Sequence, residues 1–362
     1  MYKIVKKEVL NSVVVMMEIE APYVAARCEA VQFVIVRVDE DGERIPLTIA
    51  DFDRERNTVE IIFQVVGYST TLMAKLNEGD YLQDFVGPLG QPAPLNKEWK
   101  RVIGVAGGVG AAPLYPQAKK LAEQGTKVDV IIGGRTAELV LLKEKFEKFC
   151  DNVYIMTDDG SLGEQGVVTK KLQELLDAGV KYDHAIAIGP LIMMKFVVAL
   201  TKKPEYNLPT AVSLNPIMID GTGMCGGCRV TVGGETKFAC VDGPDFDGFE
   251  VDFDQCKYAF RYPYRLRFTS LLPCTNAFSS ISGKKSTYSL TLDSSDKILP
   301  SSEDKLNIII PDKPYSVICN SPDCFHSVLP SSNHAEHATR TPFTASVFSS
   351  VITAHKAGLC GS

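Results

Sequence analysis

The stretch RVIGVAGGVGAAP, residues 101–113, decides the fold of the region around it. Its first half is an apolar run that predicts a strand, and its second half is a glycine-rich turn that opens a predicted helix. Glycines at such a turn let the backbone approach a pyrophosphate, and the start of the helix supplies N–H groups and a positive dipole. The pattern is G-x-G-x-x-P rather than the dinucleotide fingerprint G-x-G-x-x-G, with Pro113 where a first-turn proline is tolerated. A tight turn without a ligand is the structural alternative.

Residues 99–215 alternate between apolar strands and amphipathic helices. The strand-like runs are RVIGVAG, KVDVIIGG, NVYIMTDDG and HAIAIGP, and the helical ones are PLYPQAKKLAEQG, AELVLLKEKFEKF, VVTKKLQELLDAG and IMMKFVVALTKK. This alternation predicts a parallel, doubly wound α/β sheet, which binds ligands at the carboxyl ends of its strands. Three loops, the glycine-rich turn, TDDGS at 157–161 and GPLIMM at 189–194, follow strands and together predict a dinucleotide crevice on one edge.

The second predicted strand of this region ends in GGR rather than in an acid. The usual carboxylate for a ribose 2′-hydroxyl is therefore missing at that place. Arg135 suits a 2′-phosphate, although an arginine at a strand end is as often simply solvated. The choice between NAD and NADP stays open.

Residues 1–98 are rich in short strand-like runs. VVVMMEIEA, QFVIVRV, TVEIIFQVV and DYLQDFVG are separated by turn signals, which predicts a small β-barrel. RIPLTIAD, at 44–51, places a proline in a strand, and because proline prefers a sheet edge, this edge can face a flat ring. GYSTTLM, at 67–73, is a hydroxyl cluster after a glycine and suits phosphate oxygens at a helix start. An ordinary edge strand and an ordinary N-cap are the structural alternatives.

Residues 216–255 form a short module rich in cysteine and glycine. The spacing Cys225-x2-Cys228-x11-Cys240 fits zinc or iron–sulfur ligation. Asp220 stands where a plant-type [2Fe–2S] motif has its first cysteine, and the surrounding glycines suit a loop whose N–H groups bond cluster sulfides. Zinc would need a further Cys or His, and His184 is the only histidine before residue 256. An iron–sulfur cluster is favoured; zinc and reduced structural cysteines remain alternatives.

Residues 256–362 differ in kind from the rest. The first 255 residues hold four Ser and 25 Gly, whereas the last 107 hold nineteen Ser and three Gly, without helical periodicity. We interpret this atypical, Ser-rich tail either as a disordered extension or as a sequence with no folding history, such as a frameshifted or fused read-through. A zinc pattern, Cys319-x4-Cys324 with His334-x2-His337, is a minor alternative.

Composition narrows the functional class. The net charge of −6 argues against nucleic acid as a partner, and no segment reads as membrane-spanning. The amino-terminal apolar run is too short for the core of a signal peptide, so we expect a cytoplasmic protein. Clustered cysteines there more often bind metal or do redox work than form disulfides.

The order of these regions resembles a known family. The chain is similar to the electron-transfer subunit of dihydroorotate dehydrogenase. It is more similar to the small (alpha) subunit of NADH-dependent reduced ferredoxin:NADP+ oxidoreductase, also named ferredoxin–NADP reductase subunit alpha. The motifs that carry the resemblance are RIPLTIAD, DFVGPLG, AGGVGAAP, GGRT, TDDGS and SLNPIMIDGTGMCGGCRV, and the likeness covers residues 1 to about 255. It implies a ferredoxin–NADP reductase-like architecture with a flavin barrel, a nucleotide domain and a small [2Fe–2S] module.

The resemblance also implies cofactors and the residues that bind them. FAD is expected along Pro46, Leu47 and Thr48, with Thr48 assigned to catalysis, and near Gly67, Ser69, Thr70 and Thr71. NAD(H) or NADP(H) is expected against Gly107, Gly108, Gly110, Pro113, Gly133, Arg135, Asp158, Gly189 and Pro190. The [2Fe–2S] ligands implied are Asp220, Cys225, Cys228 and Cys240.

Three features depart from the family pattern. Val31 precedes Gln32 where relatives usually carry glycine. The arginine of the common flavin motif R-P-x-S/T would fall at Ile45, and Arg44 lies one place earlier, so no direct contact between Arg44 and the flavin pyrophosphate is expected. The usual ending of the family is short and helical, and nothing in 256–362 resembles it.

The expected function is a relay of electrons. Nicotinamide exchanges a two-electron hydride, an iron–sulfur cluster carries single electrons, and a flavin between them does both. The resemblance implies a larger partner subunit with a second flavin and further clusters, and ferredoxin reached through that complex. Alternatives are a dihydroorotate dehydrogenase-type electron-transfer subunit, a stand-alone NADPH-dependent ferredoxin reductase, and, outside the enzymes, a zinc-stabilised nucleotide-binding regulator.

Overall fold

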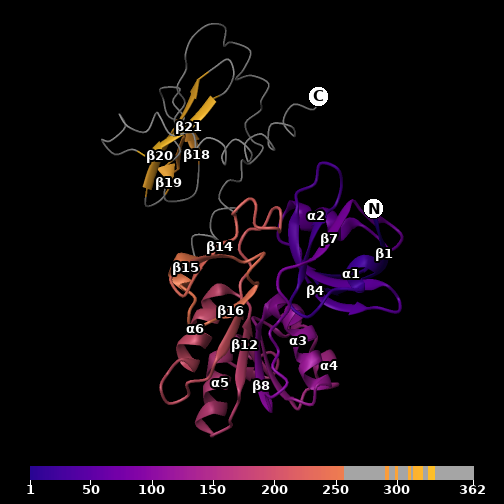
Figure 1. The fold of residues 1–362 in the computed structure, drawn as a ribbon, viewed down its shortest axis with the longest axis vertical. Helices are drawn as coiled ribbons and strands as arrows, with labels where there is room; N and C mark the ends of the chain where they lie inside the picture. The colour runs from indigo at the N-terminus through magenta and orange to yellow at the C-terminus, as the bar shows by residue number, and fades with distance from the viewer. Residues whose placement is uncertain (257–289, 293–297, 301–308, 311–312, 321–324, 331–362) are drawn as a thin grey trace. The chain divides into compact units, whose positions relative to one another are not determined.

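A computed structural model describes residues 1–256 together with 290–292, 298–300, 309–310, 313–320 and 325–330 (Figure 1). The chain divides into two units, Met1–Leu266 and Arg267–Ser362. In the part of the chain that the structure describes, no helix is long and apolar enough to cross a membrane. All the predicted site residues lie in the first unit.

The described residues of the second unit form short antiparallel strands. β17 (Leu290–Leu292) pairs with β18 (Ile298–Pro300), and β20 (Lys313–Asn320) pairs with β19 (Ile309–Ile310) and β21 (Phe325–Pro330). The prediction of a tail without a native fold falls largely on residues outside the described ones and stays a prediction. Of the minor zinc pattern, Cys324, His334 and His337 also lie outside the described residues.

An antiparallel sheet near the amino terminus is almost closed into the predicted barrel. Its order is β6-β1-β2-β5-β4-β3-β7. The strands are β1 (Tyr2–Asn11), β2 (Val14–Glu20), β3 (Phe33–Arg37), β4 (Ile45–Asp53), β5 (Thr58–Gln64), β6 (Tyr81–Leu82) and β7 (Asp84–Leu89). The two outermost strands are separated only by Gln83, whose amide donates to the Arg37 carbonyl at 3.0 Å. Two short helices, α1 (Pro22–Ala25) and α2 (Tyr68–Lys75), accompany the sheet. The pattern of residues 2–11 had not predicted β1, because Lys and Glu dominate its exposed positions.

Val31, one of the departures from the family pattern, has a left-handed backbone. Its φ is +76°, a conformation that suits glycine and is strained for a β-branched residue. The side chain is fully buried in the barrel core. Packing of the isopropyl group therefore opposes the backbone strain that a glycine at this position avoids.

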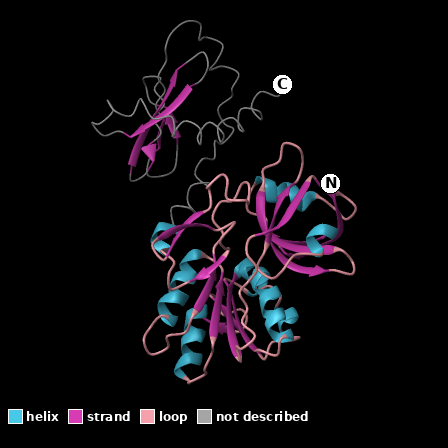
Figure 2. Cartoon of the chain, viewed as in Figure 1, coloured by secondary structure: helices cyan, strands magenta, loops and turns pink. Residues whose placement is uncertain are grey.

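The nucleotide domain is the predicted doubly wound sheet. Its order is β11-β10-β9-β8-β12-β13-β16, and every neighbouring pair is parallel except β13 with β16. The strands are β8 (Arg101–Gly107), β9 (Lys127–Gly134), β10 (Asn152–Thr157), β11 (Glu164–Gln165), β12 (His184–Ile188), β13 (Thr210–Ser213) and β16 (Asp245–Asp247). Figure 2 shows helices on both sides of this sheet. α3 (Ala111–Glu123) and α4 (Lys143–Phe146) lie on one side, and α5 (Val168–Asp177) and α6 (Leu191–Thr201) lie on the other (Figure 1).

The predicted helix at 137–149 is wrong for most of its length. The structure has a 3-10 turn, η2 (Ala137–Leu139), and then the single turn of α4. Between them Leu142 has a φ of +60°, which interrupts a right-handed helix. Leu141 is buried and Val140 packs on the same core cluster, so the chain turns to direct these side chains inward instead of continuing as a helix.

The cysteine module is joined to the nucleotide sheet. Its hairpin, β14 (Arg229–Val232) and β15 (Glu235–Phe238), is followed by β16, which pairs with β13 in the register Ser213↔Asp245. The boundary that the sequence placed at residue 215 is thus crossed by a shared sheet. The sequence had not predicted this pairing, because a three-residue strand gives no periodic signal.

Asp245 connects β16 to α3 at this junction. Its Oδ2 accepts a hydrogen bond from Gln117 Nε2 at 3.2 Å, and its Oδ1 is buried without a hydrogen-bond partner among the described residues. Burial raises the pKa of the Asp245 carboxyl to about 6, although the Gln117 amide opposes the shift. The native state therefore holds this proton more tightly than the unfolded chain does.

We predict that Asp245→Asn removes the pH dependence of stability that this group contributes. With the folded pKa near 6 and the unfolded value near 3.8, the native protein loses up to about 3 kcal/mol of unfolding free energy from Asp245 as the pH rises through that range. Asparagine stays neutral, so the variant should be more stable than wild type by about 3 kcal/mol at pH 8 and by about half as much at pH 5. Chemical denaturation at both pH values measures this difference.

Asp129→Asn is the matched control for this prediction. Asp129 is also buried, but Arg101 Nη2 lies 2.7 Å from its Oδ2. The control should be destabilised at both pH values, because it removes a buried carboxylate that accepts hydrogen bonds from Arg101 and Tyr182. An Asp245→Asn variant less stable than wild type at pH 8 would contradict the prediction.

Candidate functional site

The predicted nucleotide-binding residues lie along one edge of the parallel sheet. β10, β9, β8 and β12 are neighbours in that order, so the loops after them emerge side by side. Gly107 ends β8, Gly108 and Gly110 form the 3-10 turn η1 (Gly108–Gly110), Pro113 lies in the first turn of α3, Gly133 and Arg135 are at the end of β9, Asp158 follows β10, and Gly189 and Pro190 follow β12. The structure thus brings together all the strand-end loops that the sequence singled out.

Several of these glycines are required by packing. A Cβ on Gly110 would lie 2.2 Å from the Ile188 carbonyl oxygen, and one on Gly189 would lie 3.0 Å from the Gly107 nitrogen. The ends of β8 and β12 therefore approach more closely than any side chain allows. Gly108 differs, because its φ is +55° and a Cβ there would meet open space. Close packing explains Gly110 and Gly189, whereas Gly108 keeps an uncovered backbone at the edge.

Arg135 and Asp158 flank this edge. Arg135 is exposed, and its guanidinium makes no ion pair or hydrogen bond with any described residue. The Asp158 amide donates to the Gly134 carbonyl at 3.1 Å, which fixes the loop after β10 against the end of β9. A cation without a partner at this place is available to a negatively charged group.

The predicted flavin residues of the barrel fall into two groups. Pro46, Leu47 and Thr48 are half-buried on β4. They pair with Ile35, Val34 and Phe33 of β3, respectively. Proline is accommodated here because the pairing of β4 with β5 begins only at Ile49, so at Pro46 β4 is paired on one side only.

The second group surrounds the start of α2. Gly67 is its N-cap, and Thr70 Oγ1 accepts hydrogen bonds from the amides of Gly67 and Val66, both at 3.1 Å. The Ser69 hydroxyl donates to Glu43 Oε2 at 3.1 Å. Thr70 therefore caps the helix, as the structural alternative expected, and Thr71 follows it in the first turn. Other first-turn N–H groups have no acceptor within the helix and remain open to an anion.

A β-hairpin brings two of the three cysteines together. Cys228 precedes β14 and Cys240 follows β15 by one residue, and the Ala239 amide donates to the Cys228 carbonyl at 3.0 Å. Their Sγ atoms lie 3.2 Å apart and both side chains are buried. The turn is Gly233–Gly234, with φ of +60° and +77°, which fits a two-residue hairpin turn. The eleven residues between Cys228 and Cys240 are thus the length of a hairpin. The sequence signal for this hairpin is RVTVGGETKF, from which the hairpin had not been predicted.

The loop before the hairpin holds Asp220 and Cys225. Asp220 accepts hydrogen bonds from the amides of Thr222 at 2.9 Å and Cys225 at 2.6 Å. Burial raises the pKa of Asp220, but these amides lower it more, so the pKa of the carboxyl is below its usual range. Cys225 is exposed, and the Gly227 amide points at its sulfur at 3.5 Å. A charged carboxylate and three thiols therefore belong to one compact segment.

This donor set fits an iron–sulfur group. Backbone N–H groups already point at the sulfurs of Cys225 and Cys228, the latter from the Cys240 amide at 3.5 Å, and such bonds are typical of iron–sulfur ligands. Burial, with the adjacent Cys228 thiol, raises the pKa of Cys240, so a metal must displace that proton on binding. Among the described residues, no three His, Cys, Asp or Glu side chains already converge on one point. Asp220 as the fourth ligand therefore stays a prediction.

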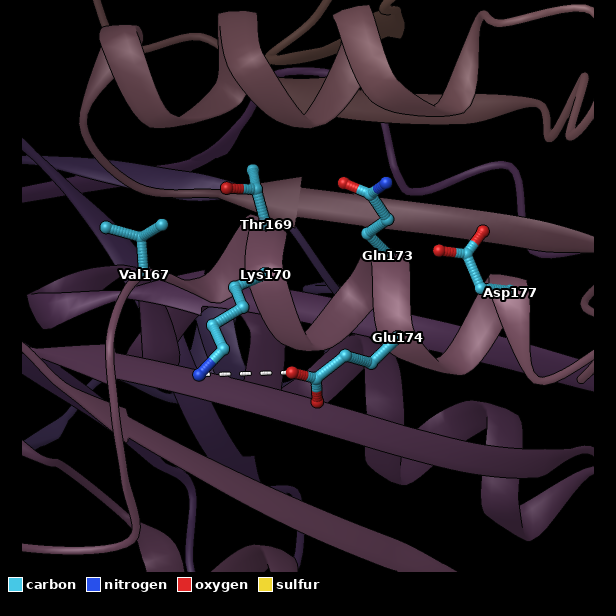
Figure 3. Close-up of a pocket in the computed structure, with 6 residues that line it drawn as sticks. All are labelled: Val167, Thr169, Lys170, Gln173, Glu174 and Asp177. Atoms are coloured by element: carbon cyan, nitrogen blue, oxygen red, sulfur yellow. Dashed lines mark ion pairs between the residues drawn. The ribbon is translucent and has the colours of Figure 1, made fainter.

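A surface depression on α5 is unrelated to these residues. Figure 3 shows it lined by Val167, Thr169, Lys170, Gln173, Glu174 and Asp177. Its side chains come from one exposed helix face, and Lys170 and Glu174 form an i,i+4 ion pair at 3.9 Å. None of the predicted site residues lines it, and its groups do not converge on a common point.

The structure adds one residue that the sequence had left without a role. Arg44 Nε donates to the Ile219 carbonyl at 2.9 Å, directly before Asp220. The only sequence signal was its displacement from the flavin motif. The contact joins segments far apart in the sequence, so no local sequence pattern predicts it.

Two domain families match the chain. A model described as the iron–sulfur cluster binding domain of dihydroorotate dehydrogenase B matches residues 215–252, and one described as an oxidoreductase NAD-binding domain matches residues 105–199. These matches confirm the predicted iron–sulfur and nucleotide-binding regions. They favour an iron–sulfur group over zinc at the cysteine loop.

Relatives and a solved structure extend the likeness to the barrel. An uncharacterized protein encoded in the adh 3′ region of Clostridium beijerinckii is 56% identical over 262 residues, covering 70% of this chain and 88% of the relative. The dihydroorotate dehydrogenase B (NAD(+)) electron transfer subunit homolog of Thermotoga maritima is 46% identical over 253 residues, with the same coverage. A chain from the structure of NADH-dependent reduced ferredoxin-NADP oxidoreductase superposes with a TM-score of 0.68 at 43% identity, covering 72% of this chain and 92% of that one.

We predict that alanine destabilises the protein more at one glycine of the turn after β8 than at the other. Gly110→Ala should lower the free energy of unfolding by about 3 kcal/mol, because overpacking against the Ile188 backbone forces the strand ends apart. Gly108→Ala should cost about 1 kcal/mol, the strain of a left-handed alanine in open space. Chemical denaturation without added nucleotide measures both. Equal losses would show that packing does not distinguish the two positions.

Proposed function

The chain belongs to the family of dihydroorotate dehydrogenase B electron transfer subunits, and on that basis we propose that it passes electrons between NAD(P)H and a [2Fe–2S] cluster through FAD. The overall activity that we propose is that of a ferredoxin–NAD(P) reductase type complex, in which this chain is the small subunit. The family establishes an oxidoreductase electron-transfer subunit. The particular donor and acceptor are the proposal.

One observation carries this proposal: the cysteine loop is seated on the barrel strands next to β4. A Cβ on Gly221 would lie 2.7 Å from Leu89 Cδ1 and 3.1 Å from Ile35 Cγ1. Ile35 is the strand partner of Pro46. The loop that carries the cluster ligands therefore touches the strand that borders the expected flavin face. A hydride carrier and a single-electron carrier exchange electrons only through a group placed between them.

The barrel residues supply the expected FAD site. When bound, FAD accepts a hydride as an electron pair and releases electrons one at a time. Pro46, Leu47 and Thr48 would lie along its ring, and Thr48 is the polar one of these three and our candidate for the catalytic residue. The pyrophosphate would be held at the start of α2, by Gly67, Ser69, Thr70 and Thr71.

The strand-end loops supply the expected nicotinamide nucleotide site. The uncovered backbone at Gly108 and the start of α3 suit the pyrophosphate. Arg135 is unpaired within the described residues and suits a 2′-phosphate, whereas the family comparison points to NADH. Gly189 and Pro190, at the end of β12, would border the nicotinamide.

A partner subunit is supported by the surface around the cysteine loop. Met224, Ile219 and Val241 expose 87%, 42% and 37% of their surface, respectively. Exposed apolar groups of this size beside a redox group are typical of a protein interface. We propose that a larger subunit with its own flavin and clusters covers this surface, and that ferredoxin reacts through that complex.

A dihydroorotate dehydrogenase-type electron-transfer subunit is the second candidate function. It is favoured by the description of the family model that matches residues 215–252 and by the printed name of the Thermotoga maritima relative. The two candidates share this chain's chemistry and differ in the partner. Assays of the purified complex with ferredoxin plus NADP+ and with dihydroorotate separate them.

The donor is tested by anaerobic stopped-flow reduction of the isolated chain. We expect bound flavin, iron and acid-labile sulfide, and we expect NADH to bleach the flavin absorbance faster than NADPH does. A strong preference for NADPH would favour a stand-alone ferredoxin reductase. Colourless protein without flavin or sulfide would leave only the zinc-stabilised regulator.

The role of Asp220 is tested by substitution. Asp220→Ala should lose most of the iron and sulfide, because it removes one ligand of four. Asp220→Cys should keep the cluster with a shifted midpoint potential, because a softer, more basic thiolate replaces the carboxylate at one iron. Asp53→Ala is the matched control, since Asp53 also accepts two loop amides, those of Glu55 and Arg56, both at 2.9 Å. Full iron content in Asp220→Ala would remove Asp220 from the ligand set.

A further inference from the structure

Arg44 links the barrel to the cysteine loop. It directly precedes β4, and its Nε donates to the Ile219 carbonyl at 2.9 Å. The side chain is only 32% exposed. Two residues after Arg44 the expected flavin face begins at Pro46, and one residue after Ile219 stands Asp220. A single side chain therefore bridges the two segments at the points where they would hold their cofactors.

Two further charges orient the Arg44 side chain. Asp84 Oδ2 lies 3.9 Å from Arg44 Nη1 and 2.6 Å from Arg37 Nε. Arg37 in turn donates from Nη1 to the Glu40 carbonyl at 2.7 Å. Such partly exposed ion pairs contribute little to stability by themselves. Their effect here is to fix the direction in which Arg44 presents its Nε–H.

The same loop is anchored a second time, on the other side of Asp220. Gly221 has a φ of +75° and packs so closely on Leu89 and Ile35 that a Cβ would overlap them. Asp220 is thus held between a hydrogen bond to the residue before it and a packing contact of the residue after it. The amides of Thr222 and Cys225 hold its carboxylate. Neither anchor depends on a residue that we assign as a metal ligand.

The displacement of the arginine from the flavin motif explains why this contact is possible. Along an extended segment successive side chains point to opposite faces, so an arginine at position 44 points away from the direction that it would take at position 45. Ile45 takes the motif position. Arg44 is therefore turned toward the cysteine module.

We propose that Arg44 is a positioning residue that sets the distance and orientation of the cluster loop relative to the flavin face of β4. This inference rests on the proposed function. Electron exchange between two cofactors depends steeply on their separation, so a device that fixes the loop governs the rate of transfer. The guanidinium also places a positive charge near the ligand Asp220, and this charge favours the cluster state that carries the extra electron.

The test compares four full-length variants purified anaerobically with their cofactors, the fourth being Gly221→Ala. Arg44→Gln removes the charge and the Nε donor, and Arg44→Lys keeps the charge. The matched control is Arg54→Gln, because Arg54 lies just beyond the other end of β4 and donates from Nη2 to the Cys28 carbonyl at 3.0 Å. The readouts are the EPR spectrum of the reduced cluster, its midpoint potential, the loss of iron to a chelator, and the rate at which the NADH-reduced flavin passes electrons to the cluster.

Arg44→Gln should show a broadened EPR spectrum, a more negative midpoint potential and slower electron transfer to the cluster. Iron loss should be about tenfold faster, as expected for the loss of one charge-assisted hydrogen bond that holds the loop. Arg44→Lys should recover the potential more than the EPR line shape, because it restores the charge but not the geometry of the donor. Gly221→Ala, which pushes the loop off Leu89, should broaden the EPR spectrum. It removes no charge, so it should not make the midpoint potential more negative as Arg44→Gln does.

The proposal is overturned if Arg44→Gln matches Arg54→Gln in potential, EPR spectrum and electron-transfer rate. If Arg44→Gln fails to fold, the EPR spectra and midpoint potentials of Arg44→Lys and Gly221→Ala test the proposal instead. Wild-type values in both variants overturn the proposal. Wild-type protein without a [2Fe–2S] signal is a different outcome. It removes the proposed function itself, whereas an intact cluster that is insensitive to Arg44 removes only this inference.

Discussion

The short segment from Val241 to Asp247 is the constraint on which the first unit depends. The Gly243 carbonyl accepts the Gln91 amide from the barrel at 2.7 Å, and the Pro244 carbonyl accepts the Leu214 amide from the nucleotide sheet at 2.9 Å. Asp245 then pairs across from Ser213 and bonds Gln117 of α3. Because this segment begins just after Cys240, barrel, sheet and cysteine loop are fixed relative to one another by backbone hydrogen bonds. Backbone contacts of this kind tolerate almost any change in exposed side chains.

Much of this architecture follows from local pattern, and the parts that do not are contacts between distant segments. The strands at 101–107 and 127–134 end where the sequence predicts, because each is an apolar run that closes in glycine, and the strand at 184–188 ends two residues before the end of its predicted run. The helix predicted at 137–149 fails because the burial of Leu141 prevails over local helix propensity. The convergence of the strand-end loops follows from parallel topology alone. The Arg44 contact and the β13–β16 pairing join residues far apart in sequence, and no periodicity encodes them.

The glycine-rich turn shows why a sequence motif alone does not tell which of its glycines serve the fold and which leave backbone free for a ligand. Gly110 and Gly189 are present because two strand ends approach within the space of a side chain. Gly108 is the residue whose backbone is left uncovered. If the motif served only to bind phosphate, a ligand would account for all of these glycines. If it served only the fold, a ligand would account for none of them. The geometry divides them: within one turn, close packing requires Gly110, and two residues earlier Gly108 has open space beside its backbone.

The β14–β15 hairpin has a consequence for how the protein matures. Its ladder and its Gly233–Gly234 turn join Cys228 to Cys240 through hydrogen bonds internal to the polypeptide. The hairpin therefore closes the loop between the two cysteines, with its cost in conformational entropy, before a metal binds. The polypeptide can therefore reach this arrangement before a metal binds. In it Cys225 is the exposed thiol, whereas Cys228 and Cys240 are already buried beside each other.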